Sequence, residues 1–197
     1  FFKGKEHQLQ AILKDNTKFG MYETHTIRAD HEVFSRSEFQ DIPLLKNLLS
    51  KAYKQLGTSG GGNHFVEFGI AKITDPLNEW MIGVGEYFAV LSHSGSRGLG
   101  ANIAKHYTYL ATKQCPLPKN VQHLAWLDLN THDGQEYWLA MSLAGDYAKA
   151  CHDDIHRRIA KAIGQRVVVT IENHHNFAWK EIVNGKEAIV HRKGATP

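Results

Sequence analysis

The sequence predicts an α+β protein, in which helices combine with mixed sheets built from pairs of strands. The first observation is its length, because 197 residues are enough for one domain with a sizeable core. The second is that helical periods and short β-type segments both occur, without the regular alternation that a βαβ array requires. The third is the composition: 42% hydrophobic and 22% charged residues are near the average for globular domains and argue against disorder or a coiled coil.

The first third of the chain predicts helices. Residues 1–24 are polar and mixed, with a short helix expected around residues 7–14. Residues 37–55 predict a longer helix that ends at Gly57, and Pro43 suits a first helical turn. Apolar side chains recur there at intervals of three and four residues: Ile42, Leu45, Leu48, Leu49, Ala52 and Leu56.

The middle of the chain predicts two strands followed by two helices. Residues 64–73 alternate in polarity, and residues 86–92 predict a second, more buried strand. Residues 99–112 predict a helix packed through Ile103, Tyr107 and Leu110. The longest helical pattern covers residues 134–163 and ends at Gly164. Its apolar stripe consists of Trp138, Met141, Ala144, Ala148, Cys151, Ile155, Ile159 and Ala162.

The last part of the chain predicts strands. Residues 167–172 are apolar and β-branched, which indicates a buried strand. Residues 181–183 and 187–191 predict a hairpin, because the pair Asn184 and Gly185 between them is a strong signal for a two-residue turn.

Charge and cysteine content narrow the class of protein. The formal net charge of +3 permits a nucleic-acid partner without arguing for one. No apolar run reaches the roughly 18 residues that a membrane span needs, and no signal peptide is predicted. The two cysteines, Cys115 and Cys151, form no disulfide framework and suit a reducing compartment, so we expect a cytoplasmic protein. Because the chain begins with Phe1 and stops after a glycine turn, we expect a fragment that is incomplete at both ends.

The first candidate motif is GGGNHFVE at residues 60–67. Its glycines let backbone approach an anion, and Asn63 can hydrogen-bond a phosphate. A neutral His64 imidazole can coordinate a metal. Phe65 and Glu67 lie on one strand face with Asn63, where a ring and a carboxylate suit a nucleotide base. The alternative is a flexible hairpin loop that leads into an ordinary strand.

Two further motifs follow. HSGSRGLG at residues 93–100 lies between a predicted strand and a predicted helix, and Arg97 adds a bidentate donor to the anion-binding start of that helix. A capped helix with a surface arginine is the alternative. ENHHNFAW at residues 172–179 contains adjacent histidines, which point in opposite directions in extended chain, so one of them is expected to face a site. The alternative is a loop with two solvated histidines.

Three weaker patterns have simpler explanations. HRKGAT at residues 191–196 can contact a polyanion, but a solvated strand end explains it equally well. His152 and His156 have the spacing of a helical zinc site, yet the glutamate of that motif is missing, so a solvated helix face is expected. The two cysteines have no CxxC partner and are expected to be ordinary core residues.

Taken together, GGGNHFVE, HSGSRGLG, a His-Asn pair followed two residues later by Ala, and HRKGAT resemble the RtcB family of RNA ligases. The resemblance runs from residue 57 to the end of the sequence. It implies an RtcB-like fold, with residues 37–197 as the central part of the catalytic domain and residues 1–36 as a segment of unclear role. Members of that family join RNA ends that carry a 2′,3′-cyclic phosphate or 3′-phosphate to 5′-hydroxyl ends, in tRNA splicing or RNA repair.

The resemblance also implies cofactors and site residues. The family uses GTP and two Mn²⁺ ions, held by three histidines, an aspartate and a bridging cysteine. By motif, the three histidines are His64, His93 and His175, and we expect their side chains to converge on one point. Arg97 is expected to contact an RNA phosphate. The implied contacts to GMP are Asn63, His64, Phe65, Val66, Glu67, His175 and Asn176.

Some family motifs do not occur in this sequence. Neither cysteine follows an aspartate in an Asp-x-x-Cys motif, and the HGAGR-type motif with the histidine that takes GMP covalently is absent. From the sequence we therefore expect the parent polypeptide to be the ligase and these 197 residues alone to be inactive. Two alternatives stay open: a noncatalytic RtcB-like protein that binds metal and nucleic acid, and a metal-dependent phosphoesterase.

Overall fold

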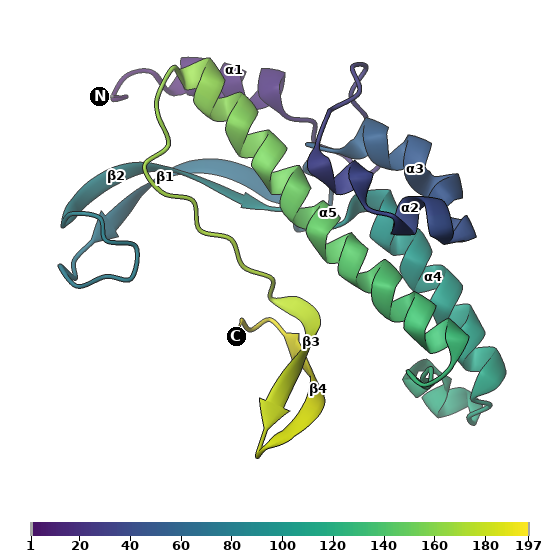
Figure 1. Cartoon of the computed structure of the whole chain (residues 1–197). Coiled ribbons are helices and arrows are strands. Elements are labelled where there is room, and N and C mark those ends of the chain that lie inside the picture. Colours follow the sequence, from purple (N-terminus) through teal and green to yellow (C-terminus); the bar gives the residue numbers. More distant parts are fainter. Residues whose placement is uncertain (1, 197) are drawn as a thin grey trace. The chain divides into compact units, whose positions relative to one another are not determined.

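The computed structural model describes residues 2–196, which divide into two compact units (Figure 1). The first unit extends to Arg166 and the second begins at Val167. The fold class is α+β, as predicted. No described helix is both long and apolar enough to cross a membrane. The elements are α1 (Glu6–Asn16), η1 (Glu32–Ser35), α2 (Glu38–Asp41), α3 (Pro43–Gln55), β1 (Phe65–Ile73), β2 (Gly85–His93), α4 (Arg97–Gln114), η2 (Lys119–Leu124), α5 (His132–Ile163), β3 (Asn176–Val183) and β4 (Lys186–Lys193).

The helix predicted over residues 37–55 is interrupted. Ile42 has extended backbone angles (φ −99°, ψ 113°) and separates α2 from α3. The reason is Pro43, whose ring disfavours the helical conformation of the residue before it. Pro43 then occupies the first turn of α3, as expected, where its missing N–H is not needed.

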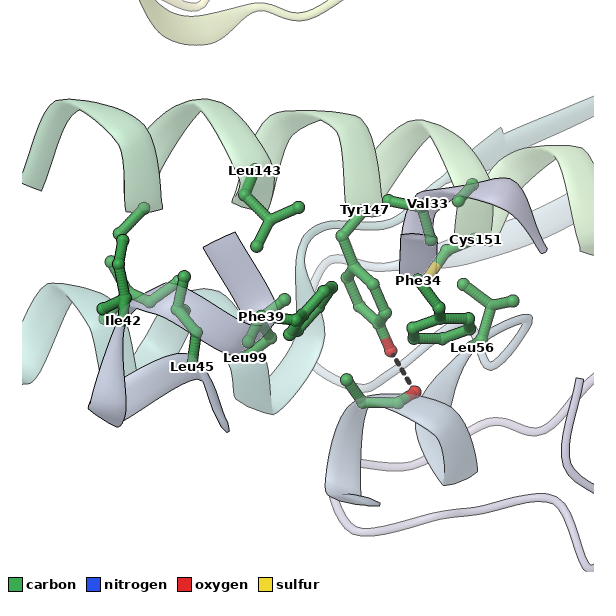
Figure 2. Packing of buried hydrophobic residues seen from close by; sticks show 14 of the residues in the cluster. Val33, Phe34, Phe39, Ile42, Leu45, Leu56, Leu99, Leu143, Tyr147 and Cys151 are labelled. Carbon is green, nitrogen blue, oxygen red and sulfur yellow. Dashed lines mark hydrogen bonds between the residues drawn. The ribbon is translucent and has the colours of Figure 1, made fainter. Parts of the chain in front are cut away.

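The core of the first unit lies between α5 and the shorter helices (Figure 2). Tyr147, which is fully buried on α5, donates a hydrogen bond of 2.8 Å to the backbone oxygen of Ala52 on α3. This bond satisfies a polar group that would otherwise be buried without a partner. The side chains packed around it include Phe39, Leu45, Leu56, Leu99, Leu143 and Cys151. Cys151 is thus a core cysteine, as expected, whereas Cys115 is half-buried.

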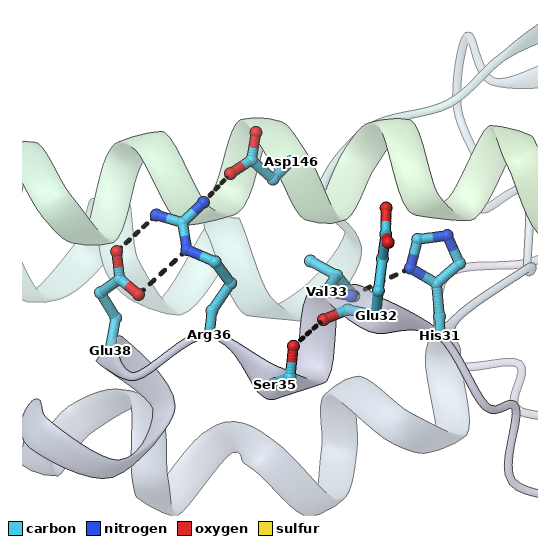
Figure 3. Close-up of polar contacts among 7 residues, drawn as sticks. All are labelled: His31, Glu32, Val33, Ser35, Arg36, Glu38 and Asp146. Carbon is cyan, nitrogen blue, oxygen red and sulfur yellow. Dashed lines mark hydrogen bonds and ion pairs between the residues drawn. The ribbon is translucent and has the colours of Figure 1, made fainter.

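Part of the N-terminal segment packs into that same core through Ala29, Val33 and Phe34. Phe34 stacks on Tyr53 with a centroid distance of 3.8 Å. Beside it, the guanidinium of Arg36 binds both Glu38 and Asp146 of α5 (Figure 3). The hydrogen bonds from Arg36 hold the pKa of Glu38 below its ordinary value. Apolar packing and ion pairs therefore attach residues 29–38 to α3 and α5.

The first strand pair is an antiparallel hairpin whose ends carry the motif histidines. β1 pairs with β2 so that Phe65 lies opposite His93, at the end nearest the glycine loop. On the inner face, Val66 packs against Ile155 and Ile159 of α5. As predicted, β2 is the less exposed of the two strands. The hairpin is thus fixed to α5 at the end where His93 lies.

The second unit contains a two-residue hairpin turn, as predicted. Asn184 (φ 52°) and Gly185 (φ 77°) both have positive φ, as a type I′ turn requires. The strand predicted over residues 167–172 was wrong, because this segment is irregular and exposes Val168 at 69%. Within the described part of the chain no neighbouring strand pairs with it, and an unpaired strand leaves its backbone groups without partners.

Candidate functional site

The glycine-rich loop between α3 and β1 is tightly packed at Gly60. Gly60 has φ +109°, and a Cβ atom there would collide with both His64 and Arg97. The loop is also covered by an N-terminal segment, since the Gly20 N–H donates a hydrogen bond of 2.7 Å to the Gly60 carbonyl oxygen. Ser59, beside Gly60, is fully buried. These contacts hold Ser59 and Gly60 in place, whereas Gly62 is exposed with open space around it. We call the glycine-rich loop, residues 57–62, the cradle.

Two of the three predicted metal ligands lie together. The ring centroids of His64 and His93 are 5.7 Å apart, with an interplanar angle of 70°. The amide of Asn63 lies 3.4 Å from Nε2 of His93. The ring of Phe65 stacks on that of His93, with centroids 5.6 Å apart and an interplanar angle of 26°. The first two motifs thus meet at the end of the β1–β2 hairpin.

The environment of His64 favours its neutral form. Burial lowers the pKa of His64 from its ordinary value, and the positive charges of His93 and Arg97 lower it further. Among the described residues, Nδ1 of His64 is one of the buried side-chain atoms without a hydrogen-bond partner. Neutral imidazoles are the histidine form that binds divalent transition ions. The pair His64 and His93 therefore fits a metal ion, although residues 2–196 hold no preformed group of three ligands.

Arg97 lies in the site but does not point freely into it. It begins α4 with φ +53°, and its Nε donates a hydrogen bond of 2.8 Å to Oγ1 of Thr58. Its Nη2 donates to the carbonyl oxygens of Gly20 (2.9 Å) and Met21 (3.3 Å). The guanidinium thus joins the glycine loop to the N-terminal segment. In this conformation it stabilises the cradle, a role that sequence reasoning missed.

The predicted nucleotide contacts divide between two faces of β1. Phe65 and Glu67 are exposed and lie on the face that also carries His93. Val66 is only 6% exposed and packs against α5, so its side chain is not available to a nucleotide. Alternate residues of a strand point to opposite faces, so a contact from Val66 to GMP would be made by its backbone, and this contact stays a prediction. Only the backbone of Val66 stays near the site.

His175 and Asn176 belong to the second unit. There the carbonyl oxygen of His175 accepts a hydrogen bond of 3.2 Å from the Ala195 N–H, and Oδ1 of Asn176 accepts one of 3.0 Å from Gly194. His174 stacks on Phe177 at 5.3 Å. These contacts bring the third and fourth motifs together at one end of the β3–β4 hairpin. Convergence of His175 with the histidines of the first unit stays a prediction.

Two histidines expected on a solvated helix face instead contact the end of β2. His152 is 9% exposed, and its Nε2 lies 3.2 Å from both the amide nitrogen and the carbonyl oxygen of Ser94. Nε2 of His156 lies 2.9 Å from Oγ of Ser92. The sequence does hold a signal for this position, since both histidines fall in the same helical stripe as Ile155 and Ile159.

A glycine-rich loop, two neighbouring histidines and a half-buried guanidinium are groups suited to a class of site that binds anions or a metal ion. Comparison with known proteins identifies the protein family. The family model described as "tRNA-splicing ligase RtcB" matches residues 2–197, and the chain belongs to this family.

Curated relatives carry the same family name. The chain is 31% identical to a tRNA-splicing ligase RtcB of Pyrococcus abyssi, over 72% of this chain and 18% of that protein. It is 28% identical to the Methanococcus maripaludis protein of the same name, over 98% of this chain and 46% of the relative. It is 29% identical to an RNA-splicing ligase RtcB of Mycobacterium tuberculosis, over 95% of this chain and 48% of the relative. The chain thus spans less than half the length of each of these relatives.

Proposed function

We propose that the polypeptide carrying this sequence is an RNA ligase. Its substrates are RNA ends with a 2′,3′-cyclic phosphate or 3′-phosphate and RNA ends with a 5′-hydroxyl, as in tRNA splicing or RNA repair. It depends on GTP and Mn²⁺. The observation that carries the proposal is that the rings of His64 and His93 lie together beside Asn63, with centroids 5.7 Å apart, in a member of the RtcB family.

The metal is assigned to histidines. His64 and His93 would hold Mn²⁺, with His175 as a third ligand from the second unit. The lowered pKa of His64 supports this role, because a neutral imidazole binds a metal without first losing a proton. When bound, the metal supplies charge that stabilises phosphate oxygens during group transfer.

The nucleotide and RNA are assigned to neighbouring groups. Asn63 and the backbone of the glycine loop bind phosphate oxygens, while Phe65 and Glu67 on the exposed face of β1 bind the base. His175 and Asn176 complete the GMP contacts. Arg97 keeps its proposed role toward an RNA phosphate through a change of conformation, since its Nε and Nη2 now bind protein oxygens. Both cysteines are free thiols, which supports a reducing, cytoplasmic setting.

Covalent labelling tests the proposal. The full polypeptide is incubated with Mn²⁺ and GTP that carries a radioactive α-phosphate, and then with a 3′-phosphate RNA and a 5′-hydroxyl RNA. We expect a labelled protein and a joined RNA, both lost in His64→Ala. His123→Ala is the matched control, because His123 is an exposed histidine on η2.

The same experiment separates the alternatives. A noncatalytic RtcB-like protein would bind Mn²⁺ and RNA without becoming labelled or joining the ends. A metal-dependent phosphoesterase would remove the 3′-phosphate and form no adduct between protein and GMP. Either result, obtained with protein that is folded and binds Mn²⁺, would contradict the ligase proposal.

A further inference from the structure

The end of β2 is connected to α5 on both sides of His93. Nε2 of His156 lies 2.9 Å from Oγ of Ser92, one residue before His93. Nε2 of His152 lies 3.2 Å from the backbone nitrogen and oxygen of Ser94, one residue after it. The two histidines are one helical turn apart, so a single face of α5 reaches both serines.

The backbone at this place needs such partners. The ladder between β1 and β2 ends at the pair Phe65 and His93, so Ser94 lies beyond the last strand pairing. Backbone groups that leave a sheet while still shielded from water need another hydrogen-bond partner. His152 supplies one, as a donor to the oxygen or an acceptor from the amide, according to its tautomer.

The contacts of Ser92 and Ser94 with α5 do not involve the side chain of His93, which lies between the two serines in the sequence. Successive side chains of a strand point to opposite faces, so Ser92 faces α5 while His93 lies on the other face, against Phe65. Fixing the residues before and after His93 leaves its backbone little freedom to rotate. The direction of its imidazole toward His64 then depends on α5, where Ile155 and Ile159 hold the same end of the hairpin through Val66.

We propose that His152 and His156 are positioning residues that orient His93 toward His64 and so complete the metal site. This inference rests on the proposed function. The two side chains act through the backbone and side chain of the neighbouring serines, and they are not themselves metal ligands. Ligand orientation by surrounding groups is known to contribute strongly to metal affinity, with losses of roughly 10- to 100-fold when such groups are removed.

The test measures Mn²⁺ binding, by the electron paramagnetic resonance signal of the free ion, in the full polypeptide that carries this sequence. His152→Leu and His156→Leu keep an apolar side chain on α5 but remove the hydrogen bonds. We expect each to weaken Mn²⁺ binding roughly tenfold or more. His152→Gln and His156→Gln, whose amides still reach the serines, are expected to restore most of the affinity. His106→Leu is the matched control, a half-buried histidine on α4 that contacts Tyr107.

The outcomes distinguish the inference from the proposed function. Wild-type affinity in both folded leucine variants would overturn the inference and leave the ligase proposal standing. So would glutamine variants that fold normally but bind as weakly as the leucine variants. If a leucine variant does not fold, the glutamine variants decide the matter, since near-normal binding in them supports the inference. A wild-type protein that binds no Mn²⁺ would overturn the proposed function and this inference together.

Discussion

Arg97 shows how one side chain can be required by both fold and function. Its guanidinium, half-buried behind the glycine loop, donates to Thr58, Gly20 and Met21. Burial lowers the pKa of Arg97, yet an arginine stays charged at neutral pH, so the carbonyl oxygens around it compensate a buried cation. A lysine at this position has no planar fork with which to reach these oxygens together.

Arg97→Lys is expected to destabilise the first unit by about 1–3 kcal/mol, because it removes the hydrogen bonds of a charged donor to the buried Thr58 hydroxyl and to the carbonyl oxygens of Gly20 and Met21. Chemical denaturation followed by circular dichroism measures the free energy of unfolding. Arg166→Lys, at an exposed position, serves as the control and is expected to change it by less than about 0.5 kcal/mol. Equal stability of the two variants would show that the fork of Arg97 does not hold the cradle.

The lowered pKa of His25 leads to a prediction of how the free energy of unfolding depends on pH. Its Nε2 lies 3.1 Å from the carbonyl oxygen of Gly57, and burial lowers its pKa from the ordinary value of 6.5. A group with a lowered folded-state pKa binds protons more readily when unfolded at acidic pH. Its contribution to stability is therefore present above pH 6.5 and is lost as pH falls through the folded-state pKa.

We therefore expect the free energy of unfolding to fall between about pH 7 and pH 5, and to fall less steeply in His25→Gln. Urea titrations at several pH values measure this slope. His64, whose pKa is also lowered, contributes with the same sign in both proteins. If the wild-type protein and His25→Gln lose stability in parallel over this pH range, His25 does not contribute to the pH dependence of stability.

At the scale of elements, two helices end at glycines that have different surroundings. Gly57 follows α3 with φ +74°, and a Cβ atom there would collide with the buried carboxylate of Asp154. That carboxylate is held by Arg158 at 2.6 Å and also by Arg157. Gly164 ends α5 with φ +71° and has open space around it. The two glycines share a backbone conformation but differ in their surroundings. Alanine substitutions at the two positions therefore distinguish the cost of that conformation from the cost of crowding.

Gly164→Ala is expected to cost about 1–2 kcal/mol, the price of the left-handed conformation alone. Gly57→Ala is expected to cost about 1–3 kcal/mol more, because an added methyl group in a filled site forces its neighbours to move. Thermal and chemical denaturation of the two variants measure the difference. Similar losses in both would mean that Asp154 moves aside easily and does not support the glycine loop.

Elements with strong local signals could be predicted from the sequence. Pro43, Gly164 and the pair Asn184 and Gly185 act through their own backbone preferences, which need no knowledge of distant residues. The segment 167–172 could not be predicted, because its apolar, β-branched composition fits a strand only if another strand pairs with it. Local composition carries no information about that partner.

The site could be predicted in part for the same reason. Asn63 and His64 lie in a recognisable motif, and the hairpin pairing then brings His93 beside them. His152 and His156 escaped prediction because a helical stripe of mixed polarity fits a solvated face as well as a buried one. Only the position of β2 against α5 decides between the two.

At the scale of the whole molecule, the two units differ in what stabilises them. Within the described residues, the buried apolar core ends at Ile159. The second unit is built on one hairpin, where Arg192 pairs with Glu181 and lies 5.2 Å from the Trp179 ring centroid. A hairpin alone is at best marginally stable in water. The first unit therefore holds most of the structure that unfolds cooperatively.

Limited trypsin digestion tests this division. We expect early cleavage after the exposed Arg166 and a remaining first unit that still unfolds cooperatively, with a midpoint within about 5 °C of the intact chain. Mass spectrometry identifies the cut, and calorimetry measures the transition. A first unit that loses its cooperative transition after this cut would show that the core depends on residues beyond Arg166.

The most direct test of the central claim is to locate the metal. Crystals of the full polypeptide are soaked in MnCl₂, and anomalous diffraction is recorded at the manganese absorption edge. We expect a peak within coordination distance of His64 and His93, lost in crystals of His93→Ala. Ordered histidines with no anomalous peak beside them, or a peak only at other residues, would contradict the assignment of this cradle as the metal site of an RtcB ligase.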